Sequence, residues 1–146
     1  MTYQIVVGVD GSENAERAVV HALEVAKLRN AEVTALFAWQ YPLIGVPGAF
    51  DHQELENEAK EFLVKQVAAV NPNSDVKVTH VVAQGDPSES LLQACERLNA
   101  DLLVIGARGR EGFTGLLLGS VGQECAVHAP CSVAIIKQPK THAAAA

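Results

Sequence analysis

Glycine is concentrated in one segment of this chain. Six of the eleven glycines lie between residues 106 and 122, after an apolar run and before a helix-like pattern. Glycine lets the backbone approach a ligand closely, and a helix N-terminus offers unpaired N–H donors with a partial positive charge. Together these features predict a cradle for a phosphate group. The alternative is a flexible surface loop whose glycines serve turns. The six are Gly106, Gly109, Gly112, Gly115, Gly119 and Gly122.

Other residues of this segment have two possible roles each. Ser120 and Gln123 have the spacing of a capping box, but the Ser120 hydroxyl could instead bind a phosphate oxygen. Arg108 and Arg110 could screen the charge of a triphosphate, or they could simply be solvated. The sequence contains neither the Gly-Lys pair of a P-loop nor a GxGxxG pattern, so two common nucleotide motifs are absent.

Residues typical of catalytic or metal sites show no informative spacing. The histidines are scattered, the three cysteines form no CxxC pair, and no G-x-S-x-G motif occurs. We therefore assign no catalytic residue and no metal site built from protein ligands. The cysteines are expected to be reduced thiols in small core positions. These residues are His21, His52, His80, His128 and His142, with Cys95, Cys125 and Cys131.

The elements that must position the glycine segment follow from apolar periodicity, which alternates between strand-like and helix-like runs. Helices are expected after the N-cap Ser12, after the capping box that Asp51 opens, after Asp86 and from Ser120. The predicted strands cover residues 5–9, 33–39, 76–82, 101–106 and 131–136.

This alternation predicts an α/β fold: a single doubly wound, Rossmann-like domain with a parallel sheet and helices on both faces. Residues 1–140 form that domain, and residues 141–146 are expected to be a disordered tail. In such folds ligands bind beyond the carboxyl ends of the strands. The residues to inspect are therefore Asp10, residues 38–40, residues 83–86, and Gly106 onward.

Composition limits the possible partners. The chain has 146 residues, 49% of them apolar, and a formal net charge of −6. This balance argues against intrinsic disorder and against nonspecific binding to nucleic acid or to an anionic membrane. The N-terminus lacks the features of a signal peptide, and prolines and glycines interrupt the uncharged stretch 33–50, so a cytoplasmic protein without membrane insertion is expected.

The glycine segment resembles the ATP-binding signature of the universal stress protein family. Gly106-Ala107-Arg108-Gly109, nine further residues and Gly119-Ser120 fit the pattern G-2x-G-9x-G-[S/T]. Four further segments also resemble the family, in the expected order, and the resemblance covers about residues 3–137. They are Val7-Gly8-Val9-Asp10-Gly11-Ser12, Gly85-Asp86-Pro87, Asp101-Leu102-Leu103-Val104-Ile105-Gly106 and Pro130-Cys131-Ser132-Val133.

The resemblance implies a five-stranded parallel sheet of order 3-2-1-4-5 and a site for ATP, or for AMP or cyclic AMP, in some cases with Mg²⁺. The aspartate matching Asp10 would lie by the ribose and adenine, and the backbone at Ala38 would contact the adenine ring near Val9. Phosphates would lie at the glycine segment. Members of the family often have a histidine near the position of Arg108. The predicted nucleotide-binding residues are Gly8, Val9, Asp10, Ser12, Ala38, Gly106, Ala107, Arg108, Gly109, Gly119, Ser120 and Val121.

The chemistry of two of these residues agrees with the implied roles. Asp10 ends a buried strand, where its carboxylate needs a ribose hydroxyl or a helix N-terminus as partner. Ala38 is small enough for a base to lie against the backbone. The alternatives are a capping role for Asp10 with no ligand, and plain strand core for Ala38.

The function expected is a cytoplasmic stress-response protein that binds ATP and acts as a nucleotide-dependent switch. ATP would order residues 107–118 and so alter a surface for an unknown protein partner or a second copy. A homodimer through the apolar last strand is expected. Two alternatives stay open: a non-catalytic dimeric interaction module without nucleotide, and a slow ATP hydrolase.

Overall fold

The computed structural model describes residues 2–41, 51–108 and 118–139. Strands and helices alternate along these residues, as the periodicity predicts. The elements are β1 (Gln4–Gly8), α1 (Glu13–Arg29), β2 (Glu32–Trp39), α2 (His52–Val70), β3 (Val78–Gln84), α3 (Pro87–Arg97), β4 (Leu102–Gly106), α4 (Ser120–His128) and β5 (Ser132–Ile136).

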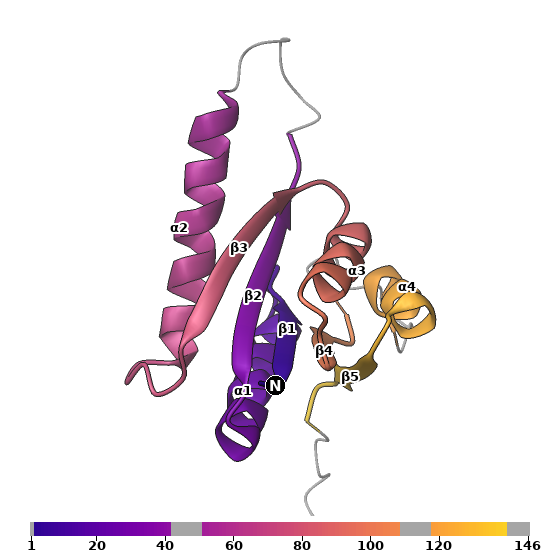
Figure 1. The fold of residues 1–146 in the computed structure, drawn as a ribbon. Helices are drawn as coiled ribbons and strands as arrows, with labels where there is room; N and C mark the ends of the chain where they lie inside the picture. The colour runs from indigo at the N-terminus through magenta and orange to yellow at the C-terminus, as the bar shows by residue number, and fades with distance from the viewer. Residues whose placement is uncertain (1, 42–50, 109–117, 140–146) are drawn as a thin grey trace, which may run out of the picture.

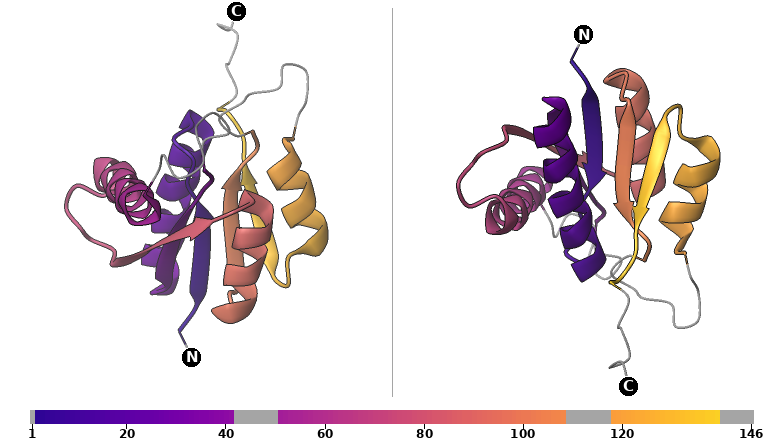
Figure 2. Two further views of the ribbon diagram at one scale, coloured as in Figure 1. Left: turned by 90° about the horizontal axis from the view of Figure 1, so that it is seen from above. Right: turned by 90° about the horizontal axis from the view of Figure 1, so that it is seen from below.

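The strands form one parallel sheet of order β3-β2-β1-β4-β5, which confirms the predicted order. Helices α1 and α2 cover one face, and α3 and α4 cover the other (Figure 1 and Figure 2). The predicted doubly wound fold is therefore confirmed. None of the helices in the described part of the chain has the length and apolarity needed to span a bilayer.

The central strands are apolar on both faces because each face is covered by helices. In β1, Ile5 and Val7 pack with α1 and α2, whereas Val6 between them packs with α3 and α4. In β4, Val104 faces the first layer, and Leu103 and Ile105 face the second. Adjacent residues of one strand thus hold the two helical layers on the same sheet.

Three of the four helix N-caps predicted from the sequence are confirmed by the structure. The side chain of Ser12 accepts a hydrogen bond from the Ala15 N–H, and that of Asp51 accepts from Gln53. Asp86 accepts from the N–H of Glu89. Each oxygen binds a donor that the helix itself leaves unpaired.

Each observed strand differs from its predicted range by one or two residues at one end or both. The first strand covers Gln4–Gly8 rather than residues 5–9, and the third covers Val78–Gln84 rather than residues 76–82. Val76 is nevertheless buried just before that strand, so its apolar character reflects packing outside the sheet ladder. The predicted tail, residues 141–146, lies outside the described residues.

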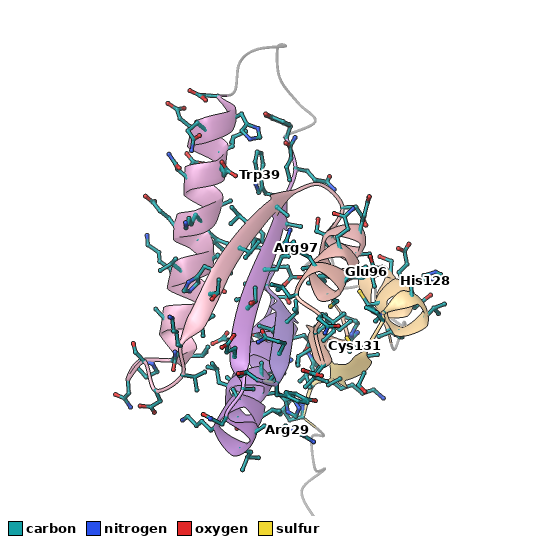
Figure 3. All side chains as sticks on the ribbon, in the orientation of Figure 1. Arg29, Trp39, Glu96, Arg97, His128 and Cys131 are labelled. Atoms are coloured by element: carbon teal, nitrogen blue, oxygen red, sulfur yellow. The ribbon has the colours of Figure 1, made fainter. Side chains whose placement is uncertain are left out.

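Trp39 ends β2 inside a small aromatic cluster (Figure 3). Its ring centroid lies 5.5 Å from that of Tyr41 and 5.2 Å from that of His52, and the Tyr41 hydroxyl hydrogen-bonds His52 Nδ1 at 2.7 Å. The Trp39 carbonyl accepts from the Gly85 N–H at 2.8 Å, which joins the ends of β2 and β3. The indole Nε1 is buried without a hydrogen-bond partner among the described residues.

The three thiols gather in the layer that α3 and α4 form on the sheet. Cys95 and Cys125 are buried, and Cys131 is half-buried. Burial raises the pKa of the Cys95 thiol to about 12 and that of Cys125 to about 11, and it raises the pKa of Cys131 as well. All three groups are therefore protonated at neutral pH, which agrees with the core role predicted for them.

We expect iodoacetamide at pH 8 to modify Cys131 of the folded protein slowly and to leave Cys95 and Cys125 unmodified. The thiolate is the reactive species, and a raised pKa together with burial keeps its population low. Intact-mass spectrometry over time measures the labelling, and the urea-unfolded chain, with three ordinary thiols, is the control. Labelling of Cys95 in the folded protein at the unfolded rate would contradict this assignment.

Candidate functional site

A pocket of about 580 Å³ opens at the carboxyl ends of the strands, between the first turns of α1, α3 and α4. The described residues that line it come from the ends of β1, β2 and β4 and from the helices that follow. They are Gly8, Val9, Asp10, Ser12, Ala15, Leu36, Ala38, Gln40, Asp86, Pro87, Ser88, Leu91, Ile105, Gly106, Ala107, Arg108, Gly119, Ser120, Val121, Gly122 and Glu124.

The pocket lies where the strand order reverses. Strands β1 and β4 pair directly, with Val7 opposite Val104. The chain leaving β1 enters α1 on one face, whereas the chain leaving β4 leads to α4 on the other (Figure 2). Because the two connections diverge, the backbone at the ends of these strands stays accessible, as expected at the switch point of a doubly wound sheet.

Asp10 and Ser12 form the turn between β1 and α1. The Asp10 carboxylate accepts a hydrogen bond from the Ser12 N–H at 2.8 Å, and the Ser12 hydroxyl accepts from the Ala15 N–H at 3.1 Å. Gly11 between them has φ = +85°, a conformation that glycine adopts readily. Asp10 is thus held by the turn while its side chain still forms part of the pocket wall.

Gly106 lies against the backbone of α1. A Cβ at this position would come within 2.8 Å of the Asn14 carbonyl carbon and of the Asn14 Cβ, and within 3.0 Å of the Ala15 nitrogen. Only glycine leaves room for this approach. The first glycine of the segment therefore serves to bring the end of β4 against the start of α1.

Three hydrogen bonds fix the base of the glycine segment. The Ala107 N–H donates to the Ile136 carbonyl at 2.8 Å, and the Ala107 carbonyl accepts from the Gly119 N–H at 2.7 Å. The Arg108 carbonyl accepts from Asn14 Nδ2 at 3.3 Å. The entry and exit of the segment are thus tied to each other, to β5 and to α1.

The first turn of α4 corrects one prediction. The N-cap is Gly119, not Ser120, and within the described part of the chain no side chain caps the helix. Ser120 is already helical, and Gln123 donates from its side chain to the Leu118 carbonyl at 3.0 Å instead of completing a capping box. The N-terminus of α4 thus opens into the pocket without a side-chain cap, which leaves its first N–H groups available to an acceptor.

The start of α3 also lines the pocket. Asp86, Pro87 and Ser88 belong to the lining, and Ser88 is buried. Gly85 before them has φ = +133° and turns the chain from β3 into the helix. The sequence indicated that a helix starts at this junction, beside the strand ends. The structure shows that the junction lines the pocket.

The structure brings eleven of the twelve predicted nucleotide-binding residues into the lining of this one pocket. Gly109, the twelfth, lies outside the described residues, as does Arg110. Contact of these residues with a nucleotide stays a prediction. The lining also contains Gln40, which lies in the strand-end segment 38–40 that the sequence indicated for inspection. It contains Glu124 as well, which residue types alone did not single out, because its place depends on how α4 packs beside the strand ends.

The charged side chains of the described lining are mainly acidic. That part of the lining contains three acidic residues and one basic residue. They are Asp10, Asp86 and Glu124, and Arg108. A polyanion would therefore rely on backbone N–H groups and on the α4 N-terminus rather than on basic side chains.

Histidines contribute nothing to this wall among the described residues. His80 lies in β3, where burial, and secondarily the charge of Lys60, lowers its pKa. Among the described residues, no three His, Cys, Asp or Glu side chains gather in a way that could hold a metal ion.

Comparison with known proteins identifies the family of this architecture. The profile of the universal stress protein family matches residues 1–137. The universal stress protein MJ0531 of Methanocaldococcus jannaschii is 32% identical over 141 residues, which cover 94% of this chain and 83% of that protein. Rv2623 of Mycobacterium tuberculosis, also a universal stress protein, is 33% identical over 94% of this chain but only 46% of its own length.

Solved structures share the fold at lower identity. A universal stress protein in complex with cAMP is 24% identical, with a TM-score of 0.72 over 92% of this chain and 96% of that one. The protein from Archaeoglobus fulgidus in complex with dAMP is 23% identical, with a TM-score of 0.65 over 92% and 98%. An AMP-bound family protein from Arabidopsis thaliana is 21% identical, with a TM-score of 0.62 over 98% and 97%.

Substitution of Gly106 by alanine tests the close approach between β4 and α1. We expect Gly106→Ala to lower the free energy of unfolding by about 1–3 kcal/mol, because the new methyl group meets backbone atoms that have no room to move. Urea unfolding followed by circular dichroism measures the change.

Gly8→Ala is the matched control, since its Cβ would meet a flexible methyl carbon of Leu91 at 3.3 Å. We expect a smaller loss there. Equal losses for the two variants would show that Gly106 is not under a special constraint.

Proposed function

This chain belongs to the universal stress protein family, and from that premise we propose that it binds an adenine nucleotide in the pocket at the ends of β1 and β4. The carrying observation is the uncapped N-terminus of α4, which opens into a pocket of about 580 Å³ beside two strand ends. The cAMP, dAMP and AMP complexes of proteins with the same fold support this ligand class.

The phosphate end of the ligand belongs at the glycine segment. Gly119 is the N-cap of α4, and its own N–H already donates to the Ala107 carbonyl. Ser120 and Val121 begin the helix, and their backbone offers N–H donors that the helix does not use. The Ser120 side chain is free of a capping role, so its hydroxyl suits a phosphate oxygen. Gly106, Ala107 and Arg108 line the facing wall, and Gly109 completes the predicted set.

The nucleoside end belongs over β1 and β2. Ala38 lines the pocket with a single methyl group, so a flat base fits against the strand there, close to Gly8 and Val9. Asp10 accepts a ribose hydroxyl while the β1–α1 turn holds it beside Ser12. The base is thus recognised through shape and backbone, and the sugar through a carboxylate.

We propose ATP as the physiological ligand, with AMP and cyclic AMP as the alternatives, and Mg²⁺ as its companion. The acidic lining supports a cation, because Asp10, Asp86 and Glu124 outnumber Arg108 among the described charges. When bound, Mg²⁺ neutralises phosphate charge and is held mostly by phosphate oxygens, water and one or two carboxylates.

A regulatory role in the cytoplasm fits a pocket that carries no assigned nucleophile or base. We infer that nucleotide occupancy changes the surface formed by the first turns of α3 and α4, and that a partner protein of a stress response reads this change. An interaction module that acts without nucleotide is the second candidate, which the apolar edge strand β5 favours.

Gly119→Val tests the nucleotide site. The φ of Gly119 is −73°, which any residue adopts, so the variant should fold. Its branched side chain would stand at the α4 N-terminus, where a phosphate must approach. We expect ATP affinity to fall by at least about a hundredfold, in line with the loss of several phosphate hydrogen bonds. Isothermal titration with ATP, AMP and cyclic AMP, with and without Mg²⁺, measures it.

Ala126→Val is the control, because it adds a similar side chain on an exposed position of α4 outside the pocket. Its affinity should equal that of the wild type. Unchanged ATP affinity in a folded Gly119→Val protein would refute the phosphate site. Failure of the wild type to bind any of the three nucleotides would favour the interaction module.

We also propose that two copies associate through β5. Among the described residues this strand is the last in the sheet and pairs only with β4, so its outer backbone groups face away from the sheet. Its Val133, Ala134, Ile135 and Ile136 are half-buried. An apolar edge of this kind is a template for pairing with a second strand.

Sedimentation equilibrium over a hundredfold range of concentration should show a monomer–dimer equilibrium. Ser132→Lys places a charge at the exposed start of β5 and should shift that equilibrium toward monomer, since lysine on an edge strand opposes pairing. A wild-type protein that sediments as monomer throughout would remove the proposed dimer.

A further inference from the structure

Asn14 connects the start of α1 to the entry of the glycine segment. It lies in the first turn of the helix, and its side chain is almost fully buried, with 6% of the residue exposed. Its amide nitrogen donates to the Arg108 carbonyl at 3.3 Å, across 94 positions of sequence. Asparagine is unfavourable inside a helix unless its amide finds partners, so this contact accounts for its presence there.

The position of Asn14 is fixed from a second side by β4. Its carbonyl carbon and Cβ would lie within 2.8 Å of a Cβ at Gly106. Gly106 and Arg108 are thus both in contact with one helical residue, and both line the pocket. Asn14 itself does not line it, so any effect on a ligand must pass through these two residues.

Arg17 fixes which way the Asn14 amide faces. One turn along α1, its guanidinium donates to Asn14 Oδ1. An asparagine amide has a donating and an accepting end, and a cation at the oxygen leaves the nitrogen for the Arg108 carbonyl. Arg17 is half-buried, and its Nε is buried without a hydrogen-bond partner among the described residues, which indicates that packing rather than solvent holds the side chain.

We propose that Asn14 is a positioning residue for the phosphate end of the pocket and that Arg17 orients it. This inference rests on the proposed nucleotide binding. The chain Arg17–Asn14–Arg108 holds the second residue after the β4 end at a fixed place in the pocket that the α4 N-terminus also lines. Its loss would displace Arg108 from the phosphate groups, while the nucleoside end over Ala38 and Asp10 stays intact.

Asn14→Leu provides the test. Leucine has a similar size and no charge, so it removes both hydrogen bonds without adding electrostatic repulsion. Isothermal titration with ATP and with adenosine compares the two ends of the ligand. We expect ATP affinity to fall about tenfold, as for the loss of a buried hydrogen bond that orients a binding group, and adenosine affinity to change by less than about twofold.

Two further variants separate positioning from stability. Val19→Ala removes core volume from the same helix, and we expect a lower urea midpoint with an unchanged ratio of ATP to adenosine affinity. Arg17→Lys keeps the charge but loses the planar fork, so the same ratio should fall to a value between wild type and Asn14→Leu.

Equal losses of ATP and adenosine affinity in Asn14→Leu, or no loss of either, would overturn the inference and leave the proposed function standing. If Asn14→Leu does not fold, Arg17→Lys provides the test instead. An unchanged ratio of ATP to adenosine affinity in Arg17→Lys would also overturn the inference. A wild-type protein that binds neither ATP nor adenosine would overturn the proposed function and this inference together.

Discussion

The contact between Gly106 and the backbone of α1 is the constraint on which the pocket depends. It brings the end of β4 within van der Waals distance of Asn14 and Ala15, where any side chain would intrude. Because Ser12 and Asp10 precede the same helix, this contact also sets the β1–α1 turn relative to β4. The base of the glycine segment then closes through the Ala107–Gly119 hydrogen bond, which aims the start of α4 at the same space.

The sheet makes this arrangement rigid. Residues that alternate along β1 and β4 belong to different cores, so the two helical layers cannot shift independently of the strands. The pocket is thus built from backbone at the ends of well-packed strands. Its acidic side chains line the pocket. The proposed phosphate site is therefore compatible with a net charge of −6, because it relies on backbone N–H groups and a helix N-terminus rather than on basic side chains.

Much of this was predictable from local sequence. Periodicity located the nine elements that the described residues form, and Asp86 followed by Pro87 identified the start of α3, because capping depends on neighbours in the chain. The strand order came from the family resemblance, since periodicity carries no information about which strands pair.

The errors have physical reasons. Gly119 and Ser120 are adjacent candidates for one cap, and the choice depends on how the Ala107 carbonyl receives Gly119, a contact made across the fold. The role of Asn14 escaped sequence reasoning for the same reason, because its partner is 94 positions away. Glu124 reaches the pocket only through the packing of α4 beside α3.

The placement of Trp39 gives the molecule an optical property. It is the sole tryptophan of the chain, so indole emission reports a single location. That location is the residue after Ala38, with the ring in an aromatic cluster and the carbonyl bound to Gly85 near the α3 start. The ring lies on the opposite side of β2 from the pocket wall, one residue away from it. The protein therefore carries a single intrinsic fluorophore on the strand that lines the pocket, with its ring on the face of that strand turned away from the pocket.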